Sequence, residues 1–411
     1  MLKNYLKIAF KVLLRRKFFT FVSLFGISFT LVVLMVATAM LDHLFAPLPP
    51  EVNQDRTVSI TRASMFGDRS SWSASAGYRL LDQYVRNLPG AERTSFFKSP
   101  DQVYSYPNGN KVRVFLKRTD GEFWRILRFD FIEGAPYTAD DLESARLVAV
   151  ITRTTRERLR LGQTAMGRTI EVDGQRFRVV GVVEDVPRLR VIPFAEMWAP
   201  YTTVKSDSYK AELLGEFNAI VLARDRAAIP GMQEELKSRL ARAELPDPKS
   251  YKKLVAPLES TFDAMARTDL RTEDSHSERL WLMMAGGALL FMLLPTVNLI
   301  NLNVSRIMER ASEIGVRKAF GASSRTLVGQ FIVENLVLTM VGGVVGFAAS
   351  ILVLRAISAS GVVPYADFRL NYRIFLYGIA LAVFFGVFSG VYPAWRMSRL
   401  NPVQALKGAA R

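Results

Sequence analysis

Four apolar runs, each long enough to cross a bilayer, constrain the fold of this chain more than any other feature. A membrane-spanning helix needs roughly 20 consecutive apolar residues, and runs of this kind occur at about 18–41, 280–303, 327–354 and 373–395. Between the first and second runs lies a polar stretch long enough to fold as a domain of its own. The sequence therefore predicts a membrane protein with four transmembrane α-helices and a large domain inserted between the first and second helices.

Lysine and arginine residues gather beside the ends of these runs, in the stretches 3–17, 306–325 and 396–411. With four spans, all three stretches fall on one side of the membrane, and an excess of basic residues marks the cytoplasmic side. The sequence therefore predicts that both termini are cytoplasmic and that the inserted domain is extracytoplasmic.

The expected organisation assigns a role to each part of the chain. It has an amphipathic cytoplasmic helix at 1–17, a first span at 18–42, the extracytoplasmic domain at 43–278, a second span at 279–304, a cytoplasmic loop at 305–325, a third span at 326–354, a short external loop at 355–372, a fourth span at 373–395 and a cytoplasmic tail at 396–411. The stretch 1–17 fits an N-terminal extension of the first span as well as it fits a separate amphipathic helix. The apolar run at 18–41 is longer than the 7–15 residues of a signal peptide, which favours an uncleaved anchor.

Composition narrows the class of protein. The chain has 411 residues, half of them hydrophobic, a net charge of +16 and no cysteine. Basic clusters are also typical of nucleic-acid binding, but here they adjoin apolar spans, where the topology rule already predicts them. No Gly-x-Ser-x-Gly or His-Glu-x-x-His motif is present, and the two histidines, His43 and His276, stand at the two ends of the inserted domain. They fit interfacial residues better than a metal or pH site.

The cytoplasmic loop at 305–325 has the pattern of a short helix. Glu313 and Arg317 are four residues apart with the acid first, the favourable order for an ion pair on a helix face. Lys318 lies near the C-terminal end, where the helix dipole favours a cation, and Gly321 is a suitable cap. On pattern alone, the stretch also fits a basic loop that only sets the topology.

This loop resembles the cytoplasmic loop of permeases in the MacB/FtsX family of ABC transporters. That pattern, Glu-Arg-x-x-Glu-Ile-Gly-x-Arg-x-Ala-x-Gly-Ala, stands here at 309–322, and the likeness continues through 330–334, 390–394 and 401–406. The inserted domain matches more loosely, through 122–124, 133–134, 177–183 and 198–200, and is similar to the periplasmic core domain of MacB-type permeases.

The resemblance implies that this chain is a permease subunit in a bacterial inner membrane. The permease subunit itself is expected to bind neither ATP nor Mg. Both would be bound by a separate cytoplasmic ABC ATPase dimer. The residues expected to seat the loop helix in that ATPase are Glu309, Arg310, Glu313, Ile314, Arg317 and Lys318. Besides membrane lipid, the expected partner is a second permease, in a homodimer or a heterodimer, because an ATPase dimer needs two docking loops. The sequence leaves open whether a periplasmic adaptor and an outer-membrane channel also take part.

Two functions follow from this resemblance. In the first, ATP-driven movement of the permease is passed to the extracytoplasmic domain, which exports or extrudes a substrate from the periplasm or the outer leaflet. In the second, an FtsX-like signal transducer activates a periplasmic enzyme without transport. The size of the inserted domain favours the first. A membrane-anchored enzyme has no catalytic constellation to support it.

Glycines within two spans indicate close helix packing. Gly342 and Gly346 in the third span, and Gly386 and Gly390 in the fourth, have Gly-x-x-x-Gly spacing, which lets helix backbones approach closely in lipid. The partner helix could belong to the same chain or to a second permease. Glycine is also common in membrane helices without such a role.

The inserted domain is predicted to be mixed α and β. Alternating runs at 112–116 and 170–172 predict strands, and Asp173-Gly174 predicts a hairpin turn. Helices are expected near 75–88, 153–161 and 231–244. The stretch 162–169 nearly matches a phosphate-binding loop, but that loop must follow a strand and open a helix, whereas here a helix is expected before it and a strand after it.

Overall fold

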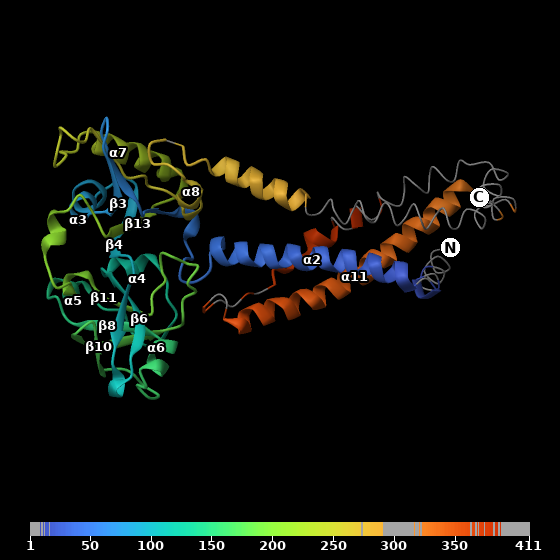
Figure 1. Cartoon of the computed structure of the whole chain (residues 1–411), viewed down its shortest axis with the longest axis horizontal. Coiled ribbons are helices and arrows are strands. Elements are labelled where there is room, and N and C mark those ends of the chain that lie inside the picture. The colour runs from blue at the N-terminus through green and yellow to red at the C-terminus, as the bar shows by residue number, and fades with distance from the viewer. Residues whose placement is uncertain are drawn as a thin grey trace. The chain divides into compact units, whose positions relative to one another are not determined.

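The computed structural model describes residues 9, 11, 13–15, 17–272, 274–290, 316, 320, 323–361, 364–365, 368, 370–373, 375–380, 383–384 and 387. The chain divides into two compact units, which are described separately. Unit 1 comprises 1–42, 281–362 and 367–411, and unit 2 comprises 43–280 and 363–366. Figure 1 shows both units, with the sheet of unit 2 marked by its strand labels.

Unit 2 is built on one large sheet of fourteen strands. The strands are β1 (Thr57–Ile60), β2 (Ala63–Phe66), β3 (Ser71–Ala76), β4 (Ala91–Lys98), β5 (Asp101–Ser105), β6 (Val112–Thr119), β7 (Phe131–Gly134), β8 (Val148–Thr152), β9 (Thr169–Val172), β10 (Gln175–Val183), β11 (Met197–Pro200), β12 (Leu214–Gly215), β13 (Phe217–Ala223) and β14 (Lys253–Val255). The main path runs β14-β2-β3-β13-β4-β6-β11-β8-β10-β7, and β1, β12, β5 and β9 pair with β13, β3, β6 and β10.

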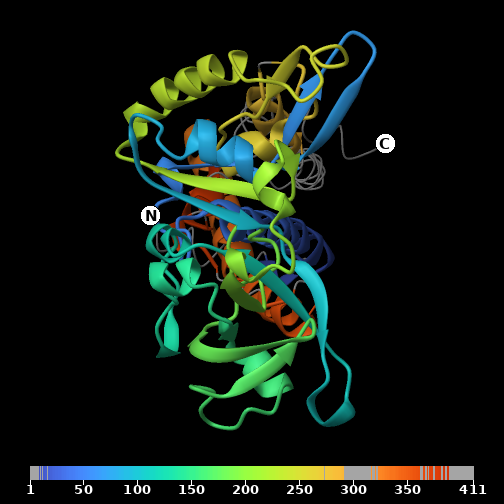
Figure 2. The same cartoon turned by 90° about the vertical axis from the view of Figure 1, so that its left-hand side faces the viewer.

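Six short helices lie along this sheet in unit 2. They are α3 (Tyr78–Leu80), α4 (Glu122–Ile126), α5 (Ala139–Glu143), α6 (Arg153–Arg158), α7 (Ile229–Ala241) and α8 (Thr261–Ala266). A single π turn, Leu81–Val85, extends α3. Figures 1 and 2 show α3 and α7 at one end of the sheet and α6 at the other, so unit 2 has two lobes that share the central strands.

Successive side chains of a strand point to opposite faces of the sheet, and this alternation divides the core of unit 2. In β13, Ala219 and Val221 belong to the core packed against α7, whereas Ile220 and Leu222 face a second core that contains Trp124 and Trp198. Each central strand therefore contributes to two cores at once, which ties the lobes into one folded body.

Most elements expected from the sequence are present in unit 2. The runs at 112–116 and 170–172 lie in β6 and β9, and β9 pairs with β10 across Asp173 and Gly174. Both turn residues have positive φ, 55° and 69°, as a two-residue hairpin of this type requires. The mixed α and β prediction is confirmed. The stretch 162–169 joins α6 to β9, in the expected order of helix before and strand after.

The predicted helix at 75–88 is wrong at its start. Residues 75 and 76 belong to β3, which pairs with β2, β12 and β13. At Gly77 an added Cβ would lie 2.0 Å from the backbone oxygen of Glu212, and the helix begins only after this close contact. Pairing with strands distant in sequence overrides the local pattern here.

Unit 1 contains two long apolar helices. Helix α2 (Lys17–Phe45) begins in this unit, and α11 (Ser324–Ser360) lies wholly within it. The segments Thr20–Phe45 and Ile332–Ser360 are long and apolar enough to cross a bilayer. Residues 277–290 and 375–380 are also helical. The rest of the second expected span, and most of the rest of the fourth, lies outside the described residues. The four-span arrangement therefore stays a prediction.

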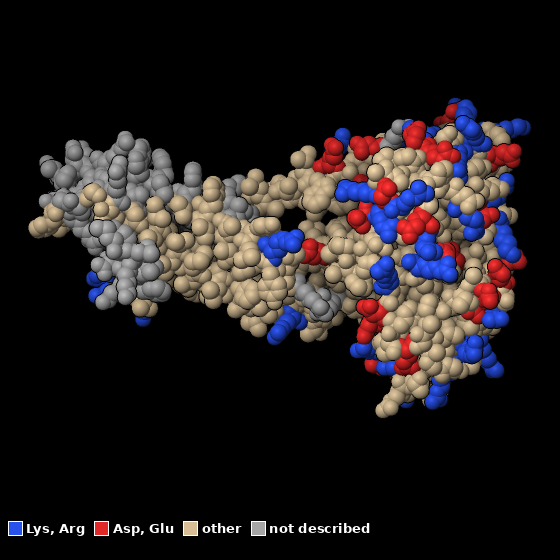
Figure 3. Space-filling view, turned by 180° about the vertical axis from the view of Figure 1, so that it is seen from behind, with Lys and Arg blue, Asp and Glu red and all other residues tan. Residues whose placement is uncertain are grey.

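The two units differ in their surfaces. Figure 3 shows acidic and basic side chains interspersed over unit 2, whereas few appear on the described surface of unit 1. Exposed apolar side chains on α2 include Phe21, Phe25 and Phe29, whose rings stack in sequence. A helix with a broad exposed apolar surface is suited to contact with lipid.

Candidate functional site

Most of the loop at 305–325, which is expected to dock with an ATPase, lies outside the described residues. This applies to each of its six candidate residues, which are Glu309, Arg310, Glu313, Ile314, Arg317 and Lys318. Gly386 and Gly390 are outside the described residues as well. Their roles stay predictions.

Gly342 and Gly346 face α2 inside unit 1. A Cβ added to Gly342 would lie 2.8 Å from Cγ2 of Ile27, and one added to Gly346 would lie 3.1 Å from Cβ of Leu31 and 3.3 Å from Cα of Ser28. The Ser28 hydroxyl donates a 3.1 Å hydrogen bond to the Gly342 carbonyl oxygen. Such close backbone approach, with a hydroxyl bonded across it, is typical of helix pairs in membranes. Contact with a second permease stays a prediction.

Buried charged side chains of unit 2 bind the linkers that join this unit to unit 1. The entry linker (46–51) directly follows α2 and is held by Arg190. The guanidinium of Arg190 donates hydrogen bonds to the backbone oxygens of Ala46 (3.0 Å) and Leu48 (3.1 Å) and to Oε2 of Glu51 (3.1 Å). The Arg190 and Glu51 side chains are 2% and 9% exposed. A rigid, five-donor guanidinium can hold several acceptors at once.

Electrostatics around Arg190 show how strongly this anchor is desolvated. Burial raises the pKa of Glu51 above its ordinary value, although Arg190 and, less strongly, Lys117 act in the opposite direction. Burying an ion pair is costly, and removing one partner of such a pair is costlier still. The pair therefore depends on the bonds that Arg190 makes to the linker.

Lys117 fixes the segment that carries Arg190. Its ammonium group is fully buried and donates hydrogen bonds to the backbone oxygens of Val191 (3.1 Å) and Ile192. Desolvation lowers the pKa of Lys117 to about 7, and Glu51 partly offsets this. Strand β6 thus holds the segment 190–192, which in turn holds the entry linker.

The exit linker (268–276), which leads from α8 to the helix at 277–290, has a matching anchor. Arg267 pairs with Glu259, with 2.7 Å between Nε and Oε1. Its Nη1 donates to the backbone oxygens of Asp269 (3.3 Å), Thr272 (2.7 Å) and Asp274 (3.3 Å). The two side chains of the pair are 5% and 9% exposed, so this anchor is as deeply buried as the first.

Glu259 also connects the exit anchor to the sheet. Its backbone forms two hydrogen bonds with Ser59 of β1, of 2.7 Å and 2.9 Å. Strand β1 pairs along its length with β13, a central strand of unit 2. The exit linker is therefore tied through one residue to the middle of the sheet.

A third anchor holds Tyr365, which follows α11 in the sequence and belongs to unit 2. The hydroxyl of Tyr365 donates a 2.6 Å hydrogen bond to Oε1 of Glu196, which also accepts a 2.9 Å bond from Arg158. Oε2 of Glu196 accepts a 3.1 Å bond from the backbone N–H of Phe115. Glu196 is 5% exposed. The entry linker, the exit linker and Tyr365 are thus each held by a buried charged side chain.

The charged groups of the three anchors are engaged with protein partners. Among the described residues no group of three or more His, Cys, Asp or Glu side chains could hold a metal ion. The acidic groups named above are occupied by arginines and backbone donors. His43 is 8% exposed, and Nδ1 of His276 lies 3.5 Å from the Asp274 carboxylate.

Two known families match most of the chain. A family described as MacB-like periplasmic core domain matches residues 20–239, which is more than half of the chain. A second family, described as FtsX-like permease C-terminal, matches residues 285–402. This chain belongs to the MacB/FtsX family of ABC transporter permeases.

Relatives of the permease include the macrolide export ATP-binding/permease protein MacB of Chromobacterium violaceum, which is 27% identical over 69% of this chain and 42% of the relative. The pyoverdine export ATP-binding/permease protein PvdT of Pseudomonas putida is 27% identical over 73% of this chain and 44% of the relative. The permease thus spans less than half the length of these two relatives. The ABC transporter permease YknZ of Bacillus subtilis is 23% identical over 82% of this chain and 81% of the relative.

Solved structures similar to part of the permease belong to the same family. The periplasmic region of MacB from Actinobacillus actinomycetemcomitans is 15% identical, with a TM-score of 0.38, over 52% of this chain and 94% of that structure. The extracellular domain of YknZ is 14% identical, with a TM-score of 0.37, over 49% of this chain and 98% of that structure.

The three anchors of the permease were missed by sequence reasoning. A faint signal existed at Arg190, because it lies between apolar residues in a stretch bounded by Pro187 and Pro193. Nothing in the sequence distinguishes Arg267 from the many exposed arginines.

The tryptophan side chains of unit 2 differ in burial. Trp124 and Trp198 are 8% and 0% exposed, whereas Trp72 is 47% exposed.

Proposed function

We propose that this permease works as one of two membrane subunits driven by a separate cytoplasmic ABC ATPase, which binds ATP and Mg. The loop 305–325 docks in a cleft of each ATPase subunit, and closure of the ATPase dimer presses the two docking loops together. The second span carries that movement to the extracytoplasmic domain. Both termini lie in the cytoplasm.

The named relatives have two kinds of organisation. The relatives named ATP-binding/permease proteins are more than twice as long as the part that this chain matches. YknZ, named a permease alone, is matched over 81% of its length. By analogy with YknZ, we propose that the ATPase of this permease is a separate chain.

The observation that carries the proposal is that buried charged residues anchor the entry linker, the exit linker and Tyr365. A movement of a span reaches unit 2 only if the connecting peptide does not stretch or unfold first. Arg190 and Arg267 together bond to five linker carbonyls, those of Ala46, Leu48, Asp269, Thr272 and Asp274. Each such bond contributes roughly 1 kcal/mol, and leaving a buried acceptor without a donor costs about 1–3 kcal/mol. In this proposal these bonds hold the linkers in place when a span moves.

In this mechanism the substrate need not cross the bilayer. Unit 2 would push or gate a substrate already in the periplasm, or extract one from the outer leaflet. A homodimer and a heterodimer both provide two docking loops. A periplasmic adaptor and an outer-membrane channel would complete an export path across a second membrane.

A second candidate function is signalling without transport. It rests on the match of residues 285–402 to a region described as FtsX-like permease C-terminal, a match that fits export and signalling alike. The same movement of unit 2 would then activate a periplasmic enzyme, such as a cell-wall hydrolase. Stoichiometric binding of a hydrolase to unit 2 would support this function, and bound peptide, lipid or drug would support export.

Charge reversal in the docking loop tests the proposal. We expect Glu313→Arg or Arg317→Glu to abolish stimulation of the partner ATPase by the permease, because either reversal places a like charge against the ATPase cleft. Membrane insertion should be unchanged. Lys249→Glu, on the exposed surface of unit 2, is the matched control and should retain stimulation. Normal stimulation in both loop variants would refute the docking assignment.

A further inference from the structure

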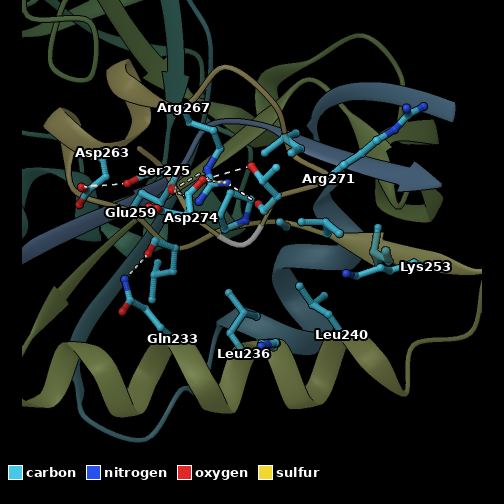
Figure 4. A pocket seen from close by; sticks show the side chains of 18 of the residues that line it. Gln233, Leu236, Leu240, Lys253, Glu259, Asp263, Arg267, Arg271, Asp274 and Ser275 are labelled. Carbon is cyan, nitrogen blue, oxygen red and sulfur yellow. Dashed lines mark hydrogen bonds and ion pairs between the residues drawn. The ribbon is translucent and has the colours of Figure 1, made fainter. Parts of the chain in front are cut away.

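A cavity of about 470 Å³ lies between α7, β14 and the exit linker of unit 2. Figure 4 shows α7 along one side and the exit linker on the other, with Leu236 and Leu240 directed from α7 into the space between them. Pockets that enclose a small organic ligand typically measure about 300–1,000 Å³. The cavity is thus large enough for such a ligand.

The inner walls of the cavity are apolar and come from both sides. They are formed by Leu236, Leu240, Leu254, Ala256, Leu258 and Leu270, each between 2% and 8% exposed. Gln233 lies at one end and uses its side-chain N–H to bond the Leu258 carbonyl oxygen at 2.9 Å. An apolar wall of this kind favours an aliphatic or aromatic body.

Charged side chains lie at both ends of the cavity. Toward the Gln233 end lie Glu259, bonded to Arg267, and Asp263, bonded to Ser260 and Ser275. Glu234, beside Gln233 on α7, adds a further acidic group to the lining. The acidic groups Glu259 and Asp263 at this end are thus already bonded, Glu259 to Arg267 and Asp263 to two serines.

The opposite end is basic. Lys253 and Arg271 lie there, beyond Leu240 in Figure 4, and both are exposed. Among the described residues neither has a carboxylate within 4 Å, and the guanidinium carbon of Arg271 lies 5.4 Å from the Phe66 ring centroid. The Arg271 guanidinium is directed away from the cavity in Figure 4, so Lys253 is the cation placed to bind an anionic group at the mouth.

We propose that this cavity binds an amphipathic anion, with its apolar body against the leucines and a carboxylate or phosphate head group beside Lys253. The wall of the site includes Arg267, Thr272 and Asp274 of the exit anchor. A bound ligand would therefore brace the linker that leads to the helix at 277–290. Binding itself does not depend on the transport role proposed above.

Photoaffinity labelling of the full-length protein in lipid nanodiscs tests this site. The probe is a decanoic acid that carries a diazirine on its chain, and the labelled peptides are identified by mass spectrometry. We expect labelling of peptides from α7 and from 253–275, with decanoate competing about fivefold to tenfold better than decanol. Equal competition by the two compounds would refute the anionic head group, since nonspecific lipid partition predicts that result.

Three variants make the test specific. Lys253→Glu should weaken labelling about fivefold to tenfold, because repulsion replaces attraction at the mouth. Ala241→Trp places a large ring at an exposed lining position and should abolish labelling without removing a core side chain. Lys249→Glu, exposed and outside the cavity, should label as the parent does. Parent-like labelling of both cavity variants, or no labelling of these peptides in the parent, would overturn the proposal.

Discussion

Replacing Arg190 by methionine should destabilise unit 2 far more than loss of an exposed arginine does. Arg190 makes bonds to Ala46, Leu48 and Glu51, and its side chain is 2% exposed. Removing one partner of a buried ion pair costs about 3–5 kcal/mol, and unit 2 falls near the size range in which 1 kcal/mol lowers the melting temperature by about 2–4 °C. We expect a loss of roughly 10 °C.

The loss in this variant should depend on pH. Burial already raises the pKa of Glu51, and without Arg190 the main opposing influence is gone, so the pKa rises further. An acid with a raised pKa in the folded state binds more protons folded than unfolded, so stability falls as pH rises toward that pKa. Arg190→Met should therefore be least defective in mild acid, and adding Glu51→Gln should restore part of the stability at neutral pH.

Thermal unfolding of the full-length protein, followed by circular dichroism in mild detergent, measures this effect. Arg176→Met is the matched control, because Arg176 is 79% exposed and its ion pair with Glu171 is at the surface. Such pairs contribute about 0–1 kcal/mol. Hydrogen exchange of residues 44–51 gives a local readout and should accelerate only in Arg190→Met. Equal melting temperatures for the two variants would refute the account of the anchors.

Three further predictions concern other parts of the molecule. Desolvation lowers the pKa of Lys117 to about 7, so the unfolded state binds more protons than the folded state between pH 7 and 10. The free energy of unfolding should therefore rise with pH in that range, by up to about 1.4 kcal/mol per pH unit. Lys117→Met should remove this rise when unfolding is measured across the pH range. Gly342→Leu should lower thermal stability through its clash with α2, whereas Gly329→Leu, with nothing within 4 Å of its added Cβ, should not; equal effects would contradict the packing described. Tyr365→Phe loses one hydrogen bond to a buried carboxylate and should cost about 1.5–3 kcal/mol, while Tyr106→Phe, 61% exposed, should cost little; the comparison is by thermal unfolding.

Local patterns in the sequence predicted the elements that local chemistry determines. Strands β6 and β9 alternate clearly, and the turn at Asp173 and Gly174 uses residues that tolerate positive φ. Helix α7 was expected because Met232, Leu236 and Leu240 recur at about one helical turn, and all three are buried. Each of these signals depends only on neighbouring residues.

The anchors could not be predicted because their partners are remote in sequence. Arg190 is more than 130 residues from Glu51, and Glu196 is 169 residues from Tyr365. Burial of an arginine is uncommon and becomes favourable only when acceptors meet it in the folded state. The start of the helix expected at 75–88 failed for the same reason, since β3 forms only when β2, β12 and β13 are in place.

The central claim is that a separate ABC ATPase drives this permease through the loop 305–325. A pull-down of the tagged full-length protein in mild detergent, with stoichiometric partners identified by mass, tests it most directly, and Arg317→Glu serves as the negative control. The account predicts that a soluble ABC ATPase is recovered with the parent protein, together with a second permease, and that the ATPase is lost from Arg317→Glu. Recovery of no ATPase with a parent protein that remains folded would contradict it.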